Sequence, residues 1–393
     1  MSNLLYDRGD FVGTIMTFLL AVSSALILYG TLYPFDFTAG AHAGGAIQIF
    51  IDSIRVRPGR GDILSNLVLF LPFGFFGMQG LLSRKSRPFR LIVVVFLGAA
   101  LSFFIECMQV NLPDRVPSIY DLILNTFGAG AGAVAGWMDW RGQLAKLRAD
   151  TRPPSMFPVL LGGAWLGYRL FPYVPTIDFQ HVKDAIKPLL HEPIPAIDVL
   201  RHFIVTLVVA RLLQALLTPT RALLAAIVIP LGVIAAKPFI VTKVIMPAEA
   251  IGVVAGVAVW VVALGRLSSR TRLLAALLAL QIAVQGLMPF TLRTEPVMFS
   301  FIPFIGFEGG SMSVNLQAFL EKVFLYGALV WLIIEMGASV MASAIMSAFF
   351  LMGIELTQMF VDGRTSEITD PLLAVLMALT LYFVDVRPHK PSA

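Results

Sequence analysis

Polar and ionisable side chains gather at one hairpin within an otherwise apolar part of the chain. Glu106 and Gln109 lie three residues apart near the end of one apolar run. Asp121 and Asn125 lie four residues apart at the start of the next run, and Arg115 lies between the two pairs. Each spacing places both members of a pair on one face of a helix. Ionisable groups at membrane depth are costly and usually face a bundle interior or a wet cavity, so this hairpin is the first candidate for a functional site.

These side chains suit more than one kind of chemistry. Carboxylates and amides together can ligate a hard cation, but Arg115 would repel a metal ion and pair with the carboxylates itself. Two carboxylates can also act as acid and base, although no histidine or nucleophile accompanies them. An arginine beside amide donors suits recognition of a phosphate or carboxylate group. A further alternative is an interfacial helix hairpin whose polar residues only cap and anchor.

Composition places the chain in a membrane. Its 393 residues are 58% hydrophobic and only 13% charged, with a mean hydropathy of +0.83. Soluble domains carry about 25% charged residues. The net charge of +5 belongs to loops between apolar segments, so we expect no nucleic-acid partner. The single cysteine, Cys107, excludes an intramolecular disulfide framework.

Apolar runs of membrane-spanning length predict an all-α polytopic protein with about twelve transmembrane helices. The predicted helices lie near 11–33, 62–82, 91–110, 119–138, 156–172, 198–217, 222–241, 248–265, 272–290, 313–334, 338–360 and 368–385. Lysine and arginine are denser in the short loops that are cytoplasmic if both termini are cytoplasmic. This orientation places the polar hairpin at the outer face. Glycines at 128, 130, 132 and 136 predict close contact between helices.

Internal similarity predicts three four-helix units, at 1–140, 156–265 and 271–386. A shift of 249 residues, without a gap, places Asn66 on Asn315, Glu106 on Glu355, Gln109 on Gln358, Arg115 on Arg364 and Asp121 on Asp370. The third unit departs at Ser311, where the first has Asp62, and at Ala374, where the first has Asn125.

The middle unit is a degenerate copy. Asp198 and His202 match Asp62 and Asn66 at a shift of 136 residues, and Lys243 and Glu249 match Arg115 and Asp121 at a shift of 128. The positions of Glu106 and Gln109 become Ile234 and Lys237. Each unit also has a proline at the outer end of its first helix, namely Pro34, Pro172 and Pro289.

Two strings of the first unit carry a recognisable pattern, GDILSNLVLFLPFGFFG at 61–77 and IECMQVNLPDRVPSIYDLILNTFGAGAG at 105–132. They resemble the VanZ-like family of bacterial membrane proteins. The matching residues are Asp62, Asn66, Phe70, Pro72, Gly74, Glu106, Gln109, Arg115, Asp121, Asn125 and Gly128. The third unit lacks the proline and glycine of the first string and has Glu321 and Val323 there. The resemblance implies a link to resistance against the glycopeptide teicoplanin, and it attaches no reaction chemistry.

We therefore expect a VanZ-like protein of the bacterial plasma membrane that recognises an envelope lipid, glycolipid or glycopeptide-type group. A structural polar lock ranks second, and a membrane enzyme on a lipid-linked substrate ranks third. A transporter or flippase is a further alternative. We expect membrane lipids as partners, and no metal or cofactor. The expected binding residues are Asp62, Asn66, Glu106, Gln109, Arg115, Asp121 and Asn125, with Asn315, Glu355, Gln358, Arg364 and Asp370 in the third unit.

Three finer expectations complete the prediction. Each arginine of the signature is expected to bridge the two carboxylates of its own unit. The loop at 173–197 is expected to be a solvated or amphipathic surface segment. The phenylalanine-rich loop at 291–312 is expected to lie at the membrane interface or to re-enter the bundle.

Overall fold

The computed structural model describes residues 2–32, 35–38, 46–55, 58–82, 85–113, 116–138, 156–176, 178–305 and 312–385. Regular structure in these ranges is helical, apart from isolated β-bridges between loops. The chain divides into two compact units, Met1–Trp140 and Arg141–Ala393. The middle and third segments of the predicted repeat both lie in the second of these, and the division into three repeat units stays a prediction.

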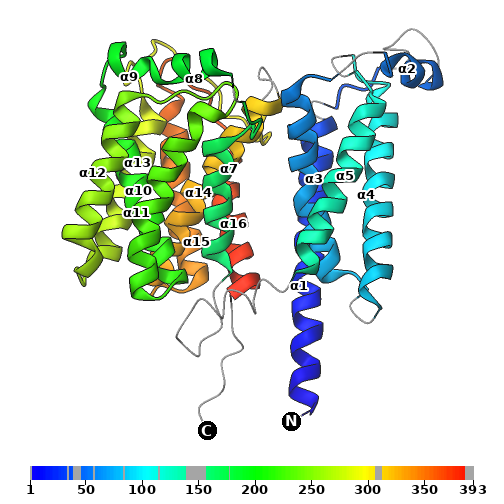
Figure 1. Ribbon diagram of the computed structural model, residues 1–393, viewed down its shortest axis with the longest axis horizontal. Helices are drawn as coiled ribbons and strands as arrows, with labels where there is room; N and C mark the ends of the chain where they lie inside the picture. The colour runs from blue at the N-terminus through cyan, green and yellow to red at the C-terminus, as the bar shows by residue number, and fades with distance from the viewer. Residues whose placement is uncertain are drawn as a thin grey trace. The chain divides into compact units, whose positions relative to one another are not determined.

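The N-terminal unit is a small helical bundle (Figure 1). It comprises α1 (Ser2–Leu32), α2 (Ala46–Ser53), α3 (Arg60–Gly80), α4 (Arg87–Gln109) and α5 (Ile119–Trp137). Helices α3 and α5 pack backbone to backbone, because a methyl group on Gly128 or Gly132 would collide with the carbonyl of Leu67 or Leu71. The predicted close helix contact is therefore confirmed at these glycines. Phe70, fully buried, lies in the core of this unit.

The C-terminal unit is a larger bundle (Figure 1). Its first part comprises α7 (Phe157–Leu170), α8 (Phe179–Ile186), α9 (Pro188–His191), α10 (Ala196–Leu216), α11 (Pro219–Ala236), the 3₁₀ turn η1 (Lys237–Phe239), α12 (Pro247–Val262) and the turn η2 (Leu264–Arg266). Its second part comprises α13 (Arg270–Leu287), α14 (Met312–Glu335), α15 (Val340–Gln358) and α16 (Thr369–Asp385). Fully buried residues of α10 and α14, such as Leu207 and Phe324, form its core.

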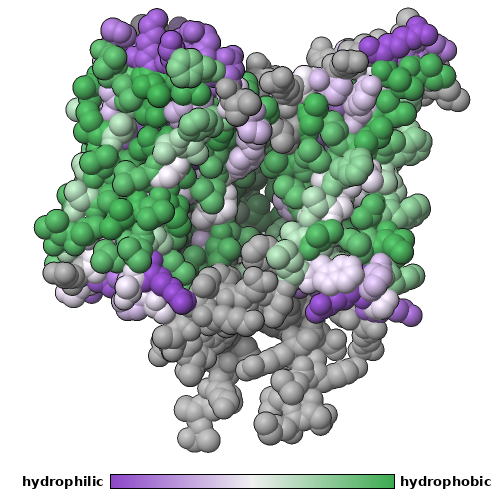
Figure 2. Space-filling view, in the orientation of Figure 1, coloured by the Kyte–Doolittle hydropathy of each residue, from purple (hydrophilic) through white to green (hydrophobic). Residues whose placement is uncertain are grey.

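The helices have the character of membrane spans. A helix lies at every position where the apolar runs predict one. Among the described residues, five helices are long and apolar enough to cross a membrane, namely Arg87–Gln109, Pro219–Phe239, Arg270–Leu287, Val314–Glu335 and Val340–Gln358. In each unit a hydrophobic band runs along the helices and hydrophilic residues lie at their ends (Figure 2). The number of about twelve transmembrane helices and the orientation of the termini stay predictions.

Two loops that the sequence singles out have defined structure. The segment at 173–197 contains the short helices α8 and α9, with Phe179 and Leu190 exposed at its surface. The described part of the phenylalanine-rich loop packs along the connection between α15 and α16. There the N–H of Ser300 donates to the carbonyl of Ser366 at 2.9 Å. Met298 and Phe301 are more than three-quarters exposed, at 92% and 80%.

Candidate functional site

The polar hairpin of the N-terminal unit joins three helices at the end where α4 finishes and α5 starts. We call this site, formed by Asp62, Asn66, Glu106 and Asp121, the N-terminal mouth. Glu106 is 2% exposed, and its Oε2 accepts a hydrogen bond from the N–H of Ser118 at 2.8 Å. Asn66 of α3 donates through Nδ2 to Oδ1 of Asp121 at 2.7 Å. The structure thus brings Asn66 and Asp121 into contact and places Glu106 at the junction of α4 and α5. A binding role for these residues stays a prediction.

The two other amides of the signature reinforce the same bundle. Gln109 donates through Nε2 to the carbonyl of Thr31 at 2.9 Å, which ties α4 to the end of α1. One turn deeper than Asp121, Asn125 donates to Oγ of Ser102 at 3.0 Å. The Oδ1 atom of Asn125 is buried without a hydrogen-bond partner. These residues therefore hold the helices together and leave one buried acceptor unused.

Acidic side chains dominate the described part of the N-terminal mouth. The carboxylates of Asp62 and Glu106 both interact electrostatically with that of Asp121. In the described ranges, no lysine or arginine forms an ion pair with any of the three. Arg115, the expected partner, lies outside the described residues. Among the residues that were described, no cluster of three or more metal-ligating side chains was found either.

The third segment reproduces two of these contacts at the predicted spacing. Oε2 of Glu355 accepts from the N–H of Glu367 at 2.8 Å, as Glu106 does from Ser118. Gln358 donates to the carbonyl of Gly286 at 2.9 Å, as Gln109 does to Thr31. Since 118 and 367 differ by the same 249 residues as the glutamates, the hairpin geometry recurs with its spacing intact.

The expected arginine bridge is wrong in the third segment. Arg364 donates through Nε to the carbonyl of Met288 at 2.6 Å and through a terminal nitrogen to that of Gln285 at 2.7 Å. The last carbonyls of a helix have no intrahelical partner, and a guanidinium fork can satisfy two of them at once. Arg364 therefore caps α13 instead of joining Glu355 to Asp370.

Asp370 finds its partners elsewhere. Its Oδ1 accepts from Nζ of Lys322 at 2.6 Å, and its other oxygen accepts from the hydroxyl of Tyr326. The ungapped alignment expected Asn315 in this place, as the counterpart of Asn66. Tyr326 is eleven residues further along α14, which is about 16 Å of helix. The alignment therefore fails in this helix, although it holds in the hairpin. An ionisable Lys322 inside an apolar run was the signal that sequence reasoning missed.

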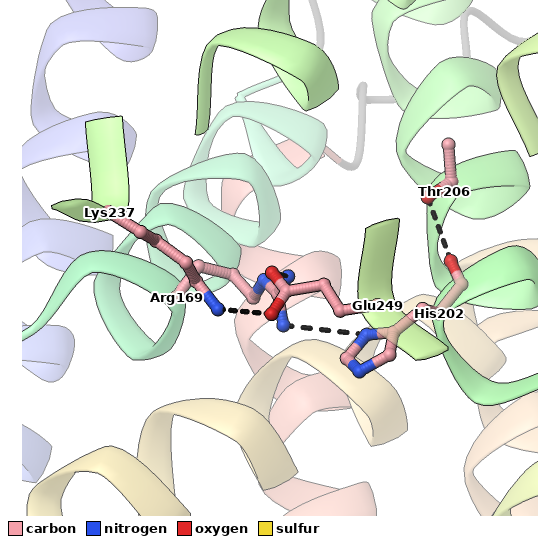
Figure 3. Close-up of polar contacts among 5 residues, drawn as sticks. All are labelled: Arg169, His202, Thr206, Lys237 and Glu249. Carbon is pink, nitrogen blue, oxygen red and sulfur yellow. Dashed lines mark hydrogen bonds and ion pairs between the residues drawn. The ribbon is translucent and has the colours of Figure 1, made fainter. Parts of the chain in front are cut away.

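The middle segment has a buried ion cluster at the corresponding place (Figure 3). Glu249 accepts from Arg169 through one oxygen and from Lys237 through the other. All three side chains are less than a tenth exposed. Nδ1 of His202 lies 3.5 Å from a terminal nitrogen of Arg169. The repeat alignment named Glu249, Lys237 and His202 without assigning them a role, and it missed Arg169, whose signal was a single arginine within the apolar α7.

The ends of the first helices share one backbone geometry. Phe35, Tyr173 and Phe290, each directly after the proline, have φ values of 65°, 56° and 65°. Each donates its N–H to the carbonyl three residues earlier. Three residues later, the N–H groups of Thr38, Thr176 and Arg293 donate to the carbonyls of Asn111, Phe239 and Phe360. These acceptors are separated by the predicted shifts of 128 and 249 residues from Asn111.

Comparison with known proteins assigns part of the chain. The model of the VanZ/LLP1 family matches residues 12–138. Comparisons with curated proteins and with solved structures find no match. The N-terminal unit thus carries a VanZ-like domain within an α-helical membrane protein. The middle and third segments lie outside the matched residues.

Proposed function

We propose that this VanZ-like protein binds the polar group of a cell-envelope lipid, glycolipid or glycopeptide at the N-terminal mouth. The observation that carries the proposal is the spare hydrogen-bonding capacity of two partly or fully buried carboxylates. A carboxylate has about four acceptor sites. In the described structure Glu106 accepts one hydrogen bond, from Ser118, and Asp121 accepts one, from Asn66. A ligand rich in hydroxyl or ammonium donors would fill the remaining sites.

A fixed framework around these carboxylates favours binding. Glu106 is held by a backbone N–H of the α4–α5 connection, and Asp121 is held by an amide from α3. The acceptors are therefore positioned before a ligand arrives, which lowers the entropic cost of binding. No histidine or nucleophile of the signature accompanies them. This arrangement supports recognition ahead of catalysis.

Three four-helix units and an outward-facing mouth belong to the same proposal. The shared backbone geometry at the ends of α1, α7 and α13 supports the three-unit organisation. The distribution of basic residues supports cytoplasmic termini in a bacterial plasma membrane. Cysteines introduced by Ser86→Cys and Lys390→Cys, after Cys107→Ala, should resist an impermeant thiol reagent in intact cells. Labelling of both from outside would reverse the orientation.

Lipid retention tests the binding function. The full chain, purified in mild detergent, should carry envelope lipid that native mass spectrometry detects. The double change Glu106→Gln and Asp121→Asn should remove most of this lipid, because neutral amides lose the charge-assisted hydrogen bonds. Glu192→Gln, which alters an exposed carboxylate in another loop, is the matched control.

Two results would contradict the proposal. Equal lipid retention by the wild type and the double variant would show that the mouth does not hold the lipid. Turnover of a lipid-linked phosphate or glycan by the wild type, abolished by Glu106→Gln in a folded protein, would make the site an enzyme.

A further inference from the structure

We propose that the N-terminal mouth binds a primary ammonium group, with Asp121 and Glu106 as its acceptors. The inference rests on the binding function proposed above and names the chemistry of the bound group. It comes from comparing three carboxylates in the same chain. Asp121, Glu249 and Asp370 each lie in the first turn of the last helix of their segment.

In two of the three segments the chain itself supplies an ammonium group to this carboxylate. Nζ of Lys322 lies 2.6 Å from Oδ1 of Asp370. Nζ of Lys237 bonds to Oε2 of Glu249, and Arg169 bonds to its other oxygen. These lysines come from different helices, so the shared feature is the ammonium at the carboxylate and not one inherited lysine position.

The N-terminal mouth lacks this feature in the described ranges. The hydrogen-bond partner of Asp121 there is the neutral amide of Asn66, and the carboxylates of Glu106 and Asp62 interact with it electrostatically. A cation from outside the chain would occupy the place that Lys322 occupies against Asp370. The ammonium groups of Lys322 and Lys237 therefore show the kind of group that a ligand would present to Asp121.

Hydrogen-bonding capacity favours an ammonium over a hydroxyl. An ammonium has three N–H donors and no acceptor, which matches a site made of acceptors. Asp121 and Glu106 each have unused acceptor sites, and the buried Oδ1 of Asn125, one turn deeper, is a further unused acceptor. In the third segment the arginine of the signature, Arg364, does not pair with the carboxylates, because it donates to the carbonyls of Met288 and Gln285.

Two sources can present this group, the headgroup of an aminophospholipid and a free amine in solution. Both are tested with the full chain in nanodiscs or detergent. Short-chain phosphatidylethanolamine, phosphatidylcholine and phosphatidylglycerol are titrated separately, and binding is followed by native mass spectrometry. Phosphatidylcholine keeps the positive charge but has no N–H donor. We expect phosphatidylethanolamine to bind about tenfold or more tightly than either, as charge-assisted hydrogen bonds require.

Asn66→Lys supplies the decisive variant. It places an ammonium of the chain beside Asp121, as Lys322 stands beside Asp370, and should abolish the preference for phosphatidylethanolamine. Glu192→Gln, which alters an exposed carboxylate outside the mouth, should preserve it. Asp121→Asn gives a second route to the same loss if Asn66→Lys fails to fold. Competition by millimolar ethanolamine would identify a soluble amine as a sufficient ligand, and its absence would identify the lipid.

The outcomes separate the two proposals. Equal binding of all three phospholipids that still depends on Glu106 and Asp121 would overturn the ammonium inference and leave the binding function standing. Binding of ethanolamine without any phospholipid would support the ammonium inference and overturn lipid binding. A preference for phosphatidylethanolamine that survives both Asn66→Lys and Asp121→Asn would place the ammonium elsewhere and overturn the inference.

Discussion

The N-terminal mouth and the ion cluster of the middle segment place a carboxylate at the same position and treat it in opposite ways. Glu249 is enclosed by Arg169 and Lys237, so both of its oxygens are paired with cations from the chain. In the described structure Asp121 accepts a hydrogen bond from the amide of Asn66, and the carboxylates of Asp62 and Glu106 interact with it electrostatically. The ion cluster of the middle segment therefore has no unpaired carboxylate oxygen for a ligand. The carboxylates of the N-terminal mouth, in contrast, keep unused hydrogen-bond acceptor sites in the described structure.

The ion cluster and the N-terminal mouth differ by residue replacements at two corresponding positions. In the N-terminal unit Gln109 donates to the carbonyl of Thr31 at the end of α1. In the middle segment Lys237 stands at the position of Gln109, and Arg169 stands three residues before Pro172, as Thr31 stands three residues before Pro34. Two cations that both pair with Glu249 thus stand where the N-terminal unit has a contact from the amide of Gln109 to the backbone of Thr31.

The largest expected effect follows from disrupting the ion cluster of the middle segment. Glu249→Gln would leave Arg169 and Lys237 buried without a counter-charge. Breaking a buried ion pair by removing one partner costs about 3–5 kcal/mol, because it strands a charge. We expect a large fall in the unfolding temperature of the purified protein. The triple change Arg169→Met, Lys237→Met and Glu249→Leu should restore most of the unfolding temperature. A Glu249→Gln variant as stable as the wild type would show that the ion cluster does not stabilise the fold.

A smaller effect is expected at the ion pair of the third segment. Lys322 is 27% exposed at its side chain and Asp370 is 11% exposed, so solvent screens this pair more than the middle one. Lys322→Met should cost about 1–3 kcal/mol of unfolding free energy. Adding Asp370→Asn should return part of it in a double-mutant cycle. Strictly additive losses would contradict a direct coupling between the two side chains.

The smallest expected effect concerns Arg364. Arg364→Ala removes two hydrogen bonds to the end of α13 and should cost about 1–2 kcal/mol. Because this arginine contacts no carboxylate among the described residues, its effect should be the same in the presence and in the absence of Glu355→Gln. A coupling energy larger than the experimental error between the two changes would restore the arginine bridge that the contacts of Arg364 contradict.

Sequence reasoning located the hairpins and missed the partners that reach them from other helices. The Glu106 and Glu355 hairpins were predictable because their spacing is local and free of gaps. Lys322 was missed because an ungapped alignment put Asn315 against Asp370, whereas α14 takes a different register from α3. Arg169 was missed because its role depends on α12 and η1, which lie far from α7 in the sequence. Long side chains can cross between helices, and spacing along one helix does not reveal such contacts.

The most direct test of the account is a cryo-EM map of the full chain in nanodiscs that contain phosphatidylethanolamine. The account predicts density that does not belong to the protein within about 3 Å of the Asp121 and Glu106 carboxylates, at hydrogen-bond distance. It predicts no such density at Glu249, where Arg169 and Lys237 already stand. A map in which a lysine or arginine of the chain occupies Asp121, with no other density beside it, would contradict the central claim.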